Sequence, residues 1–266
     1  MLRFLVILAA MMFGTALLAL NAERLLLYHF DETRISPAAA GEPRLSEVLW
    51  QTPVGDRLVL WVAPPRDGRP TILYFHGNAG NLAGRVGRFR GFLDKGYGVV
   101  AMAYPGSSGS TGEQNSEVFQ TLAEAVFADL PNLSGPGPVV VYGESLGTGV
   151  AVQLAADMGD GLAGLVLESP YTSILDVGRA QYPRLADWLY LLPNPWPSID
   201  RIGAVATPLL ILHGAEDQVV PTDMGRALFA AAGSDTKRLI VVEGAGHNDV
   251  WQANAQSALY RFLADR

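Results

Sequence analysis

Ser145 is the residue of this chain whose surroundings most directly suggest chemistry. It lies in the sequence Gly-Glu-Ser-Leu-Gly at 143–147, between the apolar run Val139–Tyr142 and a stretch of helix-forming residues. A G-x-S-x-G pattern between a strand and a helix is typical of a nucleophile elbow, a sharp turn that exposes the serine hydroxyl and requires small neighbours. A phosphate-binding P-loop fits less well, because its pattern needs a lysine that is absent here. Ser145 is therefore the predicted nucleophile.

A serine hydroxyl needs a base that takes its proton, and the chain has four histidines. His29 precedes the predicted sheet, whereas His76 and His213 each end a predicted strand. His247 lies in a glycine-rich loop after the last predicted strand and before the last predicted helix. In proteins with this elbow, the nucleophile comes first along the chain, then the acid, then the histidine. This order makes His247 the predicted base.

The acid that orients the imidazole should lie between the serine and His247 in the sequence. Asp217 fits best, since it belongs to the turn after the predicted strand Leu209–Leu212. Glu168 ends the preceding predicted strand and is the second candidate, because the strand ends of a parallel sheet point to one edge. We interpret the neighbouring Glu216 as a surface charge.

Two backbone N–H groups should stabilise the negative oxygen that forms when a serine attacks a carbonyl. One belongs to the residue after the nucleophile, which is Leu146, and the other to the loop after an early strand. The sequence Phe-His-Gly-Asn-Ala-Gly-Asn at 75–81 fits that loop, with Asn78 or its neighbour as the predicted donor. His76 has no second histidine or acid at metal-ligand spacing, so we expect no metal site. The chemistry of a serine, a histidine and an acid implies no cofactor.

These residues need a scaffold in which strands and helices alternate. Strand-like runs are predicted at Arg57–Ala63, Thr71–Phe75, Val99–Tyr104, Val139–Tyr142, Leu165–Leu167, Leu209–Leu212 and Leu239–Val242. Helix-length stretches are predicted at Leu82–Lys95, Ser116–Asp129, Leu146–Met158, Asp223–Ala232 and Asp249–Ala264. Most of the strand runs are wholly apolar, as expected for strands covered on both faces. The alternation predicts an α/β fold with one doubly wound, mostly parallel sheet.

Residues 171–202 interrupt this alternation, because no strand is predicted among them. The segment is rich in aromatic residues and proline, including Tyr182, Trp188, Trp196 and Pro193. Long insertions in α/β domains are often functional. We interpret this one as a short helical lid over the site, with a helix pair packed on the sheet edge as the alternative.

The composition excludes several classes of function. The chain has 266 residues, a net charge of −7 and no run of lysine and arginine, so nucleic acid is not an expected partner. It contains no cysteine, which excludes disulfides, thiolate metal sites and cysteine nucleophiles. Because 49% of its residues are hydrophobic, the chain can bury the core of one large domain.

The N-terminal residues 1–21 form a separate segment. From Phe4 to Leu20 no residue is charged, and about 17 residues is the lower limit for a membrane-spanning helix. A signal-peptidase site is poorly formed, since Leu20 occupies a position that prefers a small residue. We therefore expect an uncleaved signal anchor at 1–21 and a single domain at 22–266, with export after cleavage as the alternative. Arg3 and Arg24 flank the run equally, so the side of the membrane is not specified.

With these residues in place, the sequence resembles the α/β-hydrolase superfamily and, within it, the BEM46-like group of membrane-anchored serine hydrolases with short lids. The motifs are FHGNAGN at 75–81, GESLGTG at 143–149, ESPYTS at 168–173, LHGAED at 212–217 and GHND at 246–249. The resemblance covers residues 22–266 and implies that Ser145, Asp217 and His247 are the catalytic triad. Relatives often carry Tyr-Arg-Gly-Tyr-Gly where this chain has Tyr-Pro-Gly-Ser-Ser-Gly at 104–109, a difference that concerns the wall of the pocket.

The favoured function is a serine hydrolase that cleaves carboxylic esters or thioesters through an acyl-enzyme, on a small or acyl-chain substrate. A serine aminopeptidase-like amide hydrolase is the alternative, and it needs a carboxylate such as Glu144, Glu168 or Glu216 to bind the substrate amine. A third interpretation is a catalytically silent, membrane-anchored binding protein, but such proteins usually lose one member of the triad.

Overall fold

The computed structural model describes residues 23–52, 54–66, 68–186 and 194–266. The predicted signal anchor at 1–21 lies outside these ranges, and so does part of the predicted lid. Within the described ranges, no helix is both long and apolar enough to cross a membrane.

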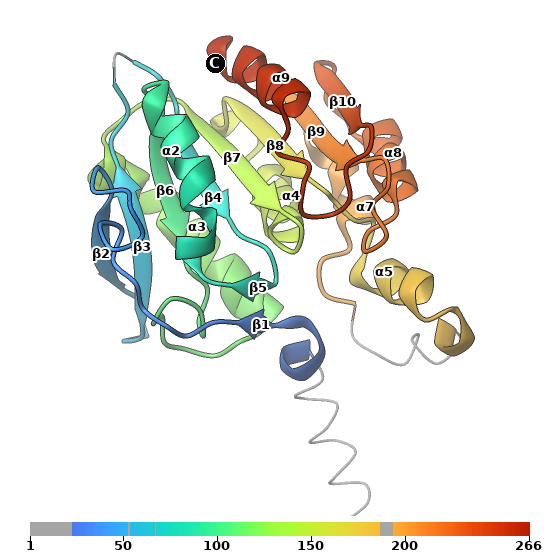
Figure 1. The fold of residues 1–266 in the computed structure, drawn as a ribbon, viewed down its shortest axis with the longest axis horizontal. Coiled ribbons are helices and arrows are strands. Elements are labelled where there is room, and N and C mark those ends of the chain that lie inside the picture. Colours follow the sequence, from blue (N-terminus) through green and yellow to red (C-terminus); the bar gives the residue numbers. More distant parts are fainter. Residues whose placement is uncertain (1–22, 53, 67, 187–193) are drawn as a thin grey trace, which may run out of the picture.

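One large twisted sheet organises the described residues (Figure 1). Its strand order is β10-β9-β8-β7-β4-β6-β3-β2. The strands are β2 Ser46–Gln51, β3 Arg57–Ala63, β4 Thr71–Phe75, β6 Gly98–Met102, β7 Val139–Glu144, β8 Gly164–Glu168, β9 Leu209–Gly214 and β10 Lys237–Val242. The strands from β10 to β6 pair in parallel, while β3 and β2 continue the sheet in antiparallel pairs. A small separate ladder joins β1 His29–Phe30 to β5 Ala79–Gly80.

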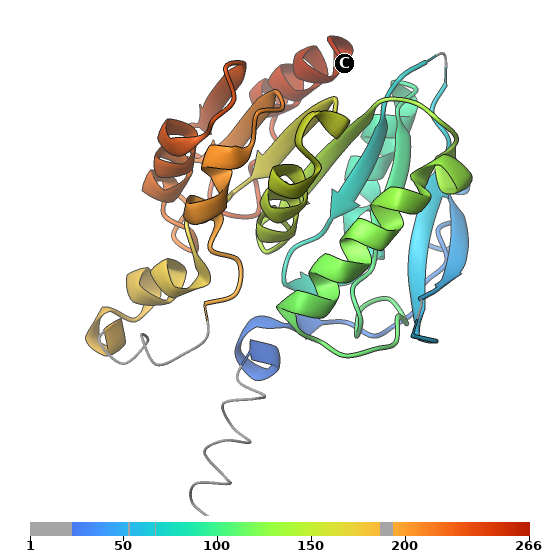
Figure 2. The same ribbon diagram turned by 180° about the vertical axis from the view of Figure 1, so that it is seen from behind.

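Helices cover both faces of the sheet. The helices α2 Val86–Asp94 and α9 Ala253–Ala264 lie on the face toward the viewer in Figure 1. On the opposite face, seen in Figure 2, are α3 Ser116–Ser134, α4 Gly147–Met158 and α8 Thr222–Ala231. Shorter helical segments are η1 Leu82–Arg85, η2 Gly159–Gly161, α5 Ile174–Gln181, η3 Pro183–Leu185, α7 Ser198–Arg201 and η4 Ile202–Ala204. This three-layer arrangement confirms the predicted α/β class with a mostly parallel sheet.

The apolar strands explain the two cores. Successive side chains of a strand point to opposite faces, so Leu58 and Leu60 of β3 enter one cluster while Val59 and Trp61 enter the other. The first cluster includes Phe119 of α3, on the face covered by α3, α4 and α8. Because helices cover both faces of the sheet, the side chains on either side of the central strands are buried, and apolar residues throughout these strands stabilise the fold.

The predicted elements correspond closely to the observed ones. Each predicted strand is present, with ends shifted by at most two residues. The predicted helix at 82–95 is a 3₁₀ turn followed by α2, and the last helix begins at Ala253 rather than Asp249. The edge strand β2 and the short strands β1 and β5 were not predicted.

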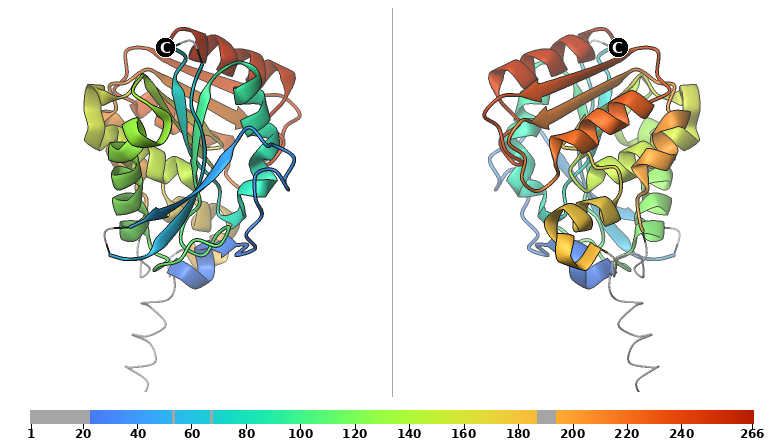
Figure 3. Two further views of the ribbon diagram at one scale, coloured as in Figure 1. Left: turned by 90° about the vertical axis from the view of Figure 1, so that its left-hand side faces the viewer. Right: turned by 90° about the vertical axis from the view of Figure 1, so that its right-hand side faces the viewer.

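Among the described residues of 171–202 there is no strand, as expected, and α5, η3 and α7 are present instead. No side chain of α5 is fully buried. Figure 3 shows α5 and the helical residues 23–27 at one end of the molecule and the C-terminus at the other. A lid function for this segment stays a prediction.

Candidate active site

Ser145 follows β7 in a strained turn. Its φ angle is 50°, in the left-handed region that non-glycine residues rarely adopt. A Cβ on Gly143 would lie 2.6 Å from the Gly147 carbonyl oxygen, and a Cβ on Gly147 would lie 2.2 Å from the Phe75 carbonyl oxygen. Both positions therefore accept only glycine without movement of the backbone, as the elbow requires.

Three side chains form a continuous series of hydrogen bonds at this turn. Ser145 Oγ lies 2.8 Å from His247 Nε2, and His247 Nδ1 lies 2.8 Å from Asp217 Oδ2. Because an ionised carboxylate only accepts, the neutral imidazole donates from Nδ1 and can accept the Ser145 proton at Nε2. Ser145 comes from the end of β7, Asp217 from the turn after β9 and His247 from the loop after β10. The structure thus brings together the three residues of the predicted triad.

Asp217 is held in place from two sides. Its Oδ1 accepts the Val219 and Val220 N–H groups at 2.9 and 2.8 Å, which leaves Oδ2 facing His247. Burial raises the pKa of this carboxyl, but hydrogen bonds from His213 and His247 outweigh burial and hold the pKa below its usual value. Asp217 is therefore a buried, ionised and rigidly oriented acceptor.

His213 is a second imidazole beside this acid, and the sequence did not assign it a role. Its Nε2 lies 2.9 Å from the Val220 carbonyl oxygen and 3.4 Å from Asp217 Oδ2. Since both of these oxygens accept, Nε2 carries the proton. Its Nδ1 has no partner among the described residues and faces Gly225, where a Cβ would lie 2.4 Å away. The sequence signal for His213 was its place at the end of β9, four residues before Asp217.

The loop after β4 lies against Ser145, as the predicted oxyanion hole requires. A Cβ on Gly77 would lie 3.5 Å from the Ser145 Cβ. Asn78 is the next residue, and neither its N–H nor that of Leu146 donates a hydrogen bond to another described residue. Both N–H groups are thus available for a ligand, and their oxyanion role stays a prediction.

His76, in the same loop, has a structural role. Its ring is fully buried between Phe30 and Tyr104, and its Nδ1 donates to the Gly77 carbonyl oxygen at 2.8 Å. Burial lowers its pKa to about 3, so this histidine is neutral at neutral pH. Among the described residues, no group of three or more histidine, aspartate or glutamate side chains could hold a metal ion.

Two partly buried glutamate–arginine pairs lie next to the three predicted triad residues, at the ends of β7 and β8. Glu144 receives the Arg85 Nε and Nη2 groups at 3.2 and 3.1 Å, together with the Tyr74 hydroxyl. Burial raises the pKa of Glu144, but Arg85 and Arg88 outweigh it and keep the pKa below its usual value.

Glu168 accepts in the same way from two other side chains, Arg88 and the Tyr142 hydroxyl. Arg88 and Glu168 are therefore a second pair, and Glu168 is not the acid that contacts His247. Glu216, the third acid considered, is exposed at the surface.

A cavity of about 220 Å³ opens beside Ser145. Its lining includes Ser145, His247, Arg85, Arg88 and Glu168. The two arginines were not singled out in the sequence, because only the fold brings η1 and α2 to the ends of β7 and β8.

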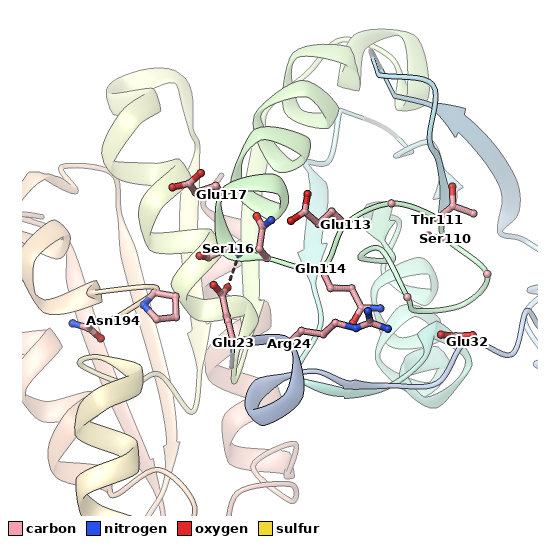
Figure 4. Close-up of a pocket in the computed structure, with 15 residues that line it drawn as sticks. Glu23, Arg24, Glu32, Ser110, Thr111, Glu113, Gln114, Ser116, Glu117 and Asn194 are labelled. Atoms are coloured by element: carbon pink, nitrogen blue, oxygen red, sulfur yellow. Dashed lines mark hydrogen bonds between the residues drawn. The ribbon is translucent and has the colours of Figure 1, made fainter. Parts of the chain in front are cut away.

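A larger cavity, of about 840 Å³, lies elsewhere and includes no member of the triad (Figure 4). It lies between residues 23–24, the loop of residues 106–117 and residues 194–195. In Figure 4 the Glu23 side chain reaches the start of α3, where it accepts the Ser116 N–H at 2.6 Å. The unusual Tyr-Pro-Gly-Ser-Ser-Gly sequence at 104–109 therefore contributes to this cavity rather than to the one at Ser145.

Comparison with known proteins agrees with this geometry. A family model described as the alpha/beta hydrolase fold matches residues 70–200, and one described as serine aminopeptidase S33 matches residues 198–250. The uncharacterized protein Rv2307c of Mycobacterium tuberculosis is 33% identical over 95% of this chain and 91% of its own length.

The lysophosphatidylserine lipase ABHD12 of Xenopus tropicalis is 33% identical over 70% of this chain, which spans about half of that relative, 52% of its length. The esterase Pf2001 of Pyrococcus furiosus has the same fold, with a TM-score of 0.73, 18% identity and coverage of 90% of this chain and 98% of the esterase. The assignment of the chain to a family rests on the family models and the sequence relatives together. The chain belongs to the α/β-hydrolase superfamily of enzymes.

Proposed function

We propose that this protein is a serine hydrolase that cleaves carboxylic ester or thioester bonds through an acyl-enzyme. The observation that carries the proposal is the series of hydrogen bonds from Ser145 through His247 to Asp217, in a turn that needs glycine on both sides. An unused arrangement of this kind is costly to maintain, because it combines a strained serine with a buried carboxylate.

The reaction begins when Ser145 Oγ attacks the carbonyl carbon and its proton passes to His247 Nε2. Asp217 stabilises the imidazolium that forms, and the N–H groups of Leu146 and Asn78 receive the negative oxygen. The bond to the leaving oxygen or sulfur then breaks, and the leaving group takes the proton from His247. A water molecule, deprotonated by His247, attacks the acyl-enzyme and releases the acid, while Ser145 regains its proton.

An aminopeptidase-like amide hydrolase is the second candidate, supported by the serine aminopeptidase family model that matches residues 198–250. That activity needs a carboxylate free to bind the substrate amine. Glu144 and Glu168 are each occupied by an arginine fork and a tyrosine hydroxyl, and Glu216 is exposed. The charge balance at the site therefore favours an ester or thioester over an amino-terminal amide.

We propose that residues 1–21 anchor the domain to a membrane and thereby keep the site close to lipid esters. The name of the ABHD12 relative, a lysophosphatidylserine lipase, supports an acyl-chain substrate. Leu25 and Leu26, in the helical residues that follow the uncharged run, leave 62% and 59% of their surface exposed. Fractionation of cells should place the full chain in the membrane pellet after an alkaline wash. A chain shortened at its N-terminus and released into the soluble fraction supports export after cleavage instead.

A substrate panel tests the hydrolase. The full chain in detergent is assayed on matched butyryl esters, butyryl thioesters and an alanyl anilide, with Ser145→Ala as the matched control. We expect hydrolysis of the esters or thioesters by the parent and none by the variant. Faster cleavage of the anilide supports the aminopeptidase, and a folded parent that cleaves nothing supports a binding protein.

A further inference from the structure

Arg88 and Glu168 form an ion pair whose two charged groups differ in exposure. Glu168 ends β8, and only 2% of its side chain is exposed, whereas Arg88 on α2 is exposed to 16%. Both residues line the 220 Å³ cavity that contains Ser145 and His247. The guanidinium is thus the more exposed partner of the pair, and we infer that a ligand entering the cavity meets it before the carboxylate.

The hydrogen bonds of the pair leave one edge of the guanidinium unused. Glu168 Oε2 accepts from Arg88 Nε at 3.3 Å and from the Tyr142 hydroxyl, while Oε1 accepts from Arg88 Nη2. Both carboxylate oxygens are therefore occupied. The Nη1 group of Arg88 makes no hydrogen bond to a described residue, and the guanidinium stacks 5.4 Å from the centre of the Trp251 ring. Arg88 is held rigidly and still has donors to offer.

Arg85 differs from Arg88 although it lines the same cavity. Its Nε and Nη2 groups bind Glu144, and its Nη1 group donates to the carbonyl oxygens of Ala79 and Asn81 at 2.8 and 3.2 Å. All three nitrogens of Arg85 are engaged in fixing the loop after β4. Of the two arginines, Arg88 is the one with a nitrogen that binds no described residue.

We propose that Arg88 forms an anion-binding subsite, through which the enzyme selects esters that carry a phosphate or carboxylate close to the scissile bond. This inference rests on the proposed function and names the class of its substrate. A guanidinium edge matches phosphate and carboxylate oxygens in geometry and charge. Because Coulomb energy falls with distance, an anion in the cavity feels the nearer Arg88 more strongly than the deeper Glu168.

The size of the cavity agrees with a compact anionic group. Its 220 Å³ lie below the range of about 300–1,000 Å³ that is usual for small-molecule pockets. This space accommodates a phosphate or carboxylate with the reacting carbonyl, whereas a long acyl chain has to extend beyond it. The subsite therefore recognises the polar part of the substrate next to the bond that breaks.

The test compares charged and neutral esters of one shape. The full chain in detergent is assayed on butyryl glycerol phosphate against butyryl glycerol, and on an aryl hemisuccinate against the aryl butyrate. The first pair places a phosphate in the leaving group, and the second places a carboxylate in the acyl group. Since hydrogen bonds to charged groups typically change an equilibrium by about tenfold to a hundredfold, we expect a preference of that size, in kcat/KM, for at least one charged ester.

The decisive variant is the double change Arg88→Gln with Glu168→Gln, which leaves no buried charge unpaired. We expect its preference for the charged ester, taken as the ratio of kcat/KM for the charged and neutral esters, to fall to about onefold, while its thermal stability stays close to that of the parent. Arg90→Gln is the matched control, because Arg90 lies on the same helix but is half-exposed and pairs with Glu42 away from the site. A preference that persists in the double variant, or is absent from the parent, overturns the inference.

A binding measurement separates this inference from the hydrolase proposal. Calorimetry with phenyl phosphate is performed on Ser145→Ala and on the same variant with Arg88→Gln and Glu168→Gln added. Binding that is lost with the added changes supports the subsite even if the parent cleaves no ester, in which case only the proposed function fails. Equal binding by both proteins, or binding by neither, contradicts the subsite.

Discussion

The Nε2 atom of His213 lies 3.4 Å from Oδ2 of Asp217, and both side chains are fully buried. The same carboxylate oxygen receives His247 Nδ1 at 2.8 Å, so two imidazoles share one acceptor. Because His213 also donates to the Val220 carbonyl oxygen, its ring is fixed in orientation. His213 is thus positioned to orient Asp217, the acid of the proposed triad.

Replacement of His213 should change catalysis through Asp217. In His213→Leu the acid loses a donor that fixes its orientation toward His247, which lowers kcat. The charge of Asp217 is then no longer shared with a second donor, which favours protonation of His247 in the free enzyme and removes the base at low pH. We expect kcat to fall by about tenfold to a hundredfold, as for one hydrogen bond to a charged group. The acidic limb of the kcat/KM profile should move to higher pH, as measured with an ester substrate across pH 5–9.

His213→Gln serves as the conservative control, because its amide can donate from nearly the same place as Nε2. It should recover a large part of kcat and most of the parent pH profile. Equal losses in the two variants, with both pH profiles unchanged, mean that His213 only fills space.

Asp217→Asn should remove most of the activity while the fold is retained. The Val219 and Val220 N–H groups require an oxygen at the Oδ1 position, so the new amide NH₂ must face His247. The imidazole then has to accept at Nδ1 and carries its proton on Nε2, where it cannot take the Ser145 proton. We expect kcat to fall by about 10⁴-fold. The control is Glu216→Gln at the exposed neighbour, and a comparable loss in that variant contradicts the assignment of the acid.

The elbow glycines should not accept a methyl group. In Gly143→Ala the new Cβ would lie 2.6 Å from the Gly147 carbonyl oxygen and 2.7 Å from the Thr148 Cα. We expect a loss of about 1–3 kcal/mol in the free energy of unfolding, as is typical of overpacking. Gly87→Ala in α2 meets nothing within 4 Å and should instead gain about 0.5–1 kcal/mol from helix propensity. Urea denaturation measures the change in the free energy of unfolding in both variants. If Gly143→Ala and Gly87→Ala change it equally, the steric explanation is wrong.

His76 should make the fold sensitive to acid. Burial lowers its pKa to about 3 in the folded protein, whereas a histidine of the unfolded chain titrates near 6.5. Between these values the unfolded state holds more protons, so acidification favours unfolding, by at most about 1.4 kcal/mol per pH unit. His76→Phe keeps a ring between Phe30 and Tyr104 and should lose this part of the pH dependence. Denaturation curves of the parent and of His76→Phe from pH 7 to 4 give the free energy of unfolding of each protein. If it falls equally in both proteins as the pH is lowered, His76 does not cause the acid sensitivity.

The central sheet could be predicted because burial on both faces makes its strands apolar throughout, as in β4 and β6. The edge strand β2 could not be predicted from its apolar residues in the same way. Among the described strands it pairs with β3 alone, and it has no fully buried residue, so polar residues such as Glu47 and Gln51 interrupt its apolar character. Edge strands carry a weaker hydrophobic signal than central ones for this reason.

The residues of the proposed triad could be located from residue type and order along the chain, because they follow the ends of three parallel strands, β7, β9 and β10. The arginine–glutamate pairs beside these residues could not be located in this way. Arg88 and Glu168 are separated by 80 residues, and Arg85 and Glu144 by 59, so only the folded chain brings them together. Glu168 was considered as the acid because it ends a strand, but Arg88 and Tyr142 occupy its carboxylate.

Covalent labelling of Ser145 tests the central claim most directly. The full chain is exposed to an alkyl fluorophosphonate, and the modified residue is located by mass spectrometry of peptides, with Ser145→Ala as the control. We expect one adduct, on Ser145, that forms in the parent and in Glu216→Gln and is absent from Ser145→Ala. A folded parent that stays unlabelled, or a label on another residue, contradicts Ser145 as an activated nucleophile.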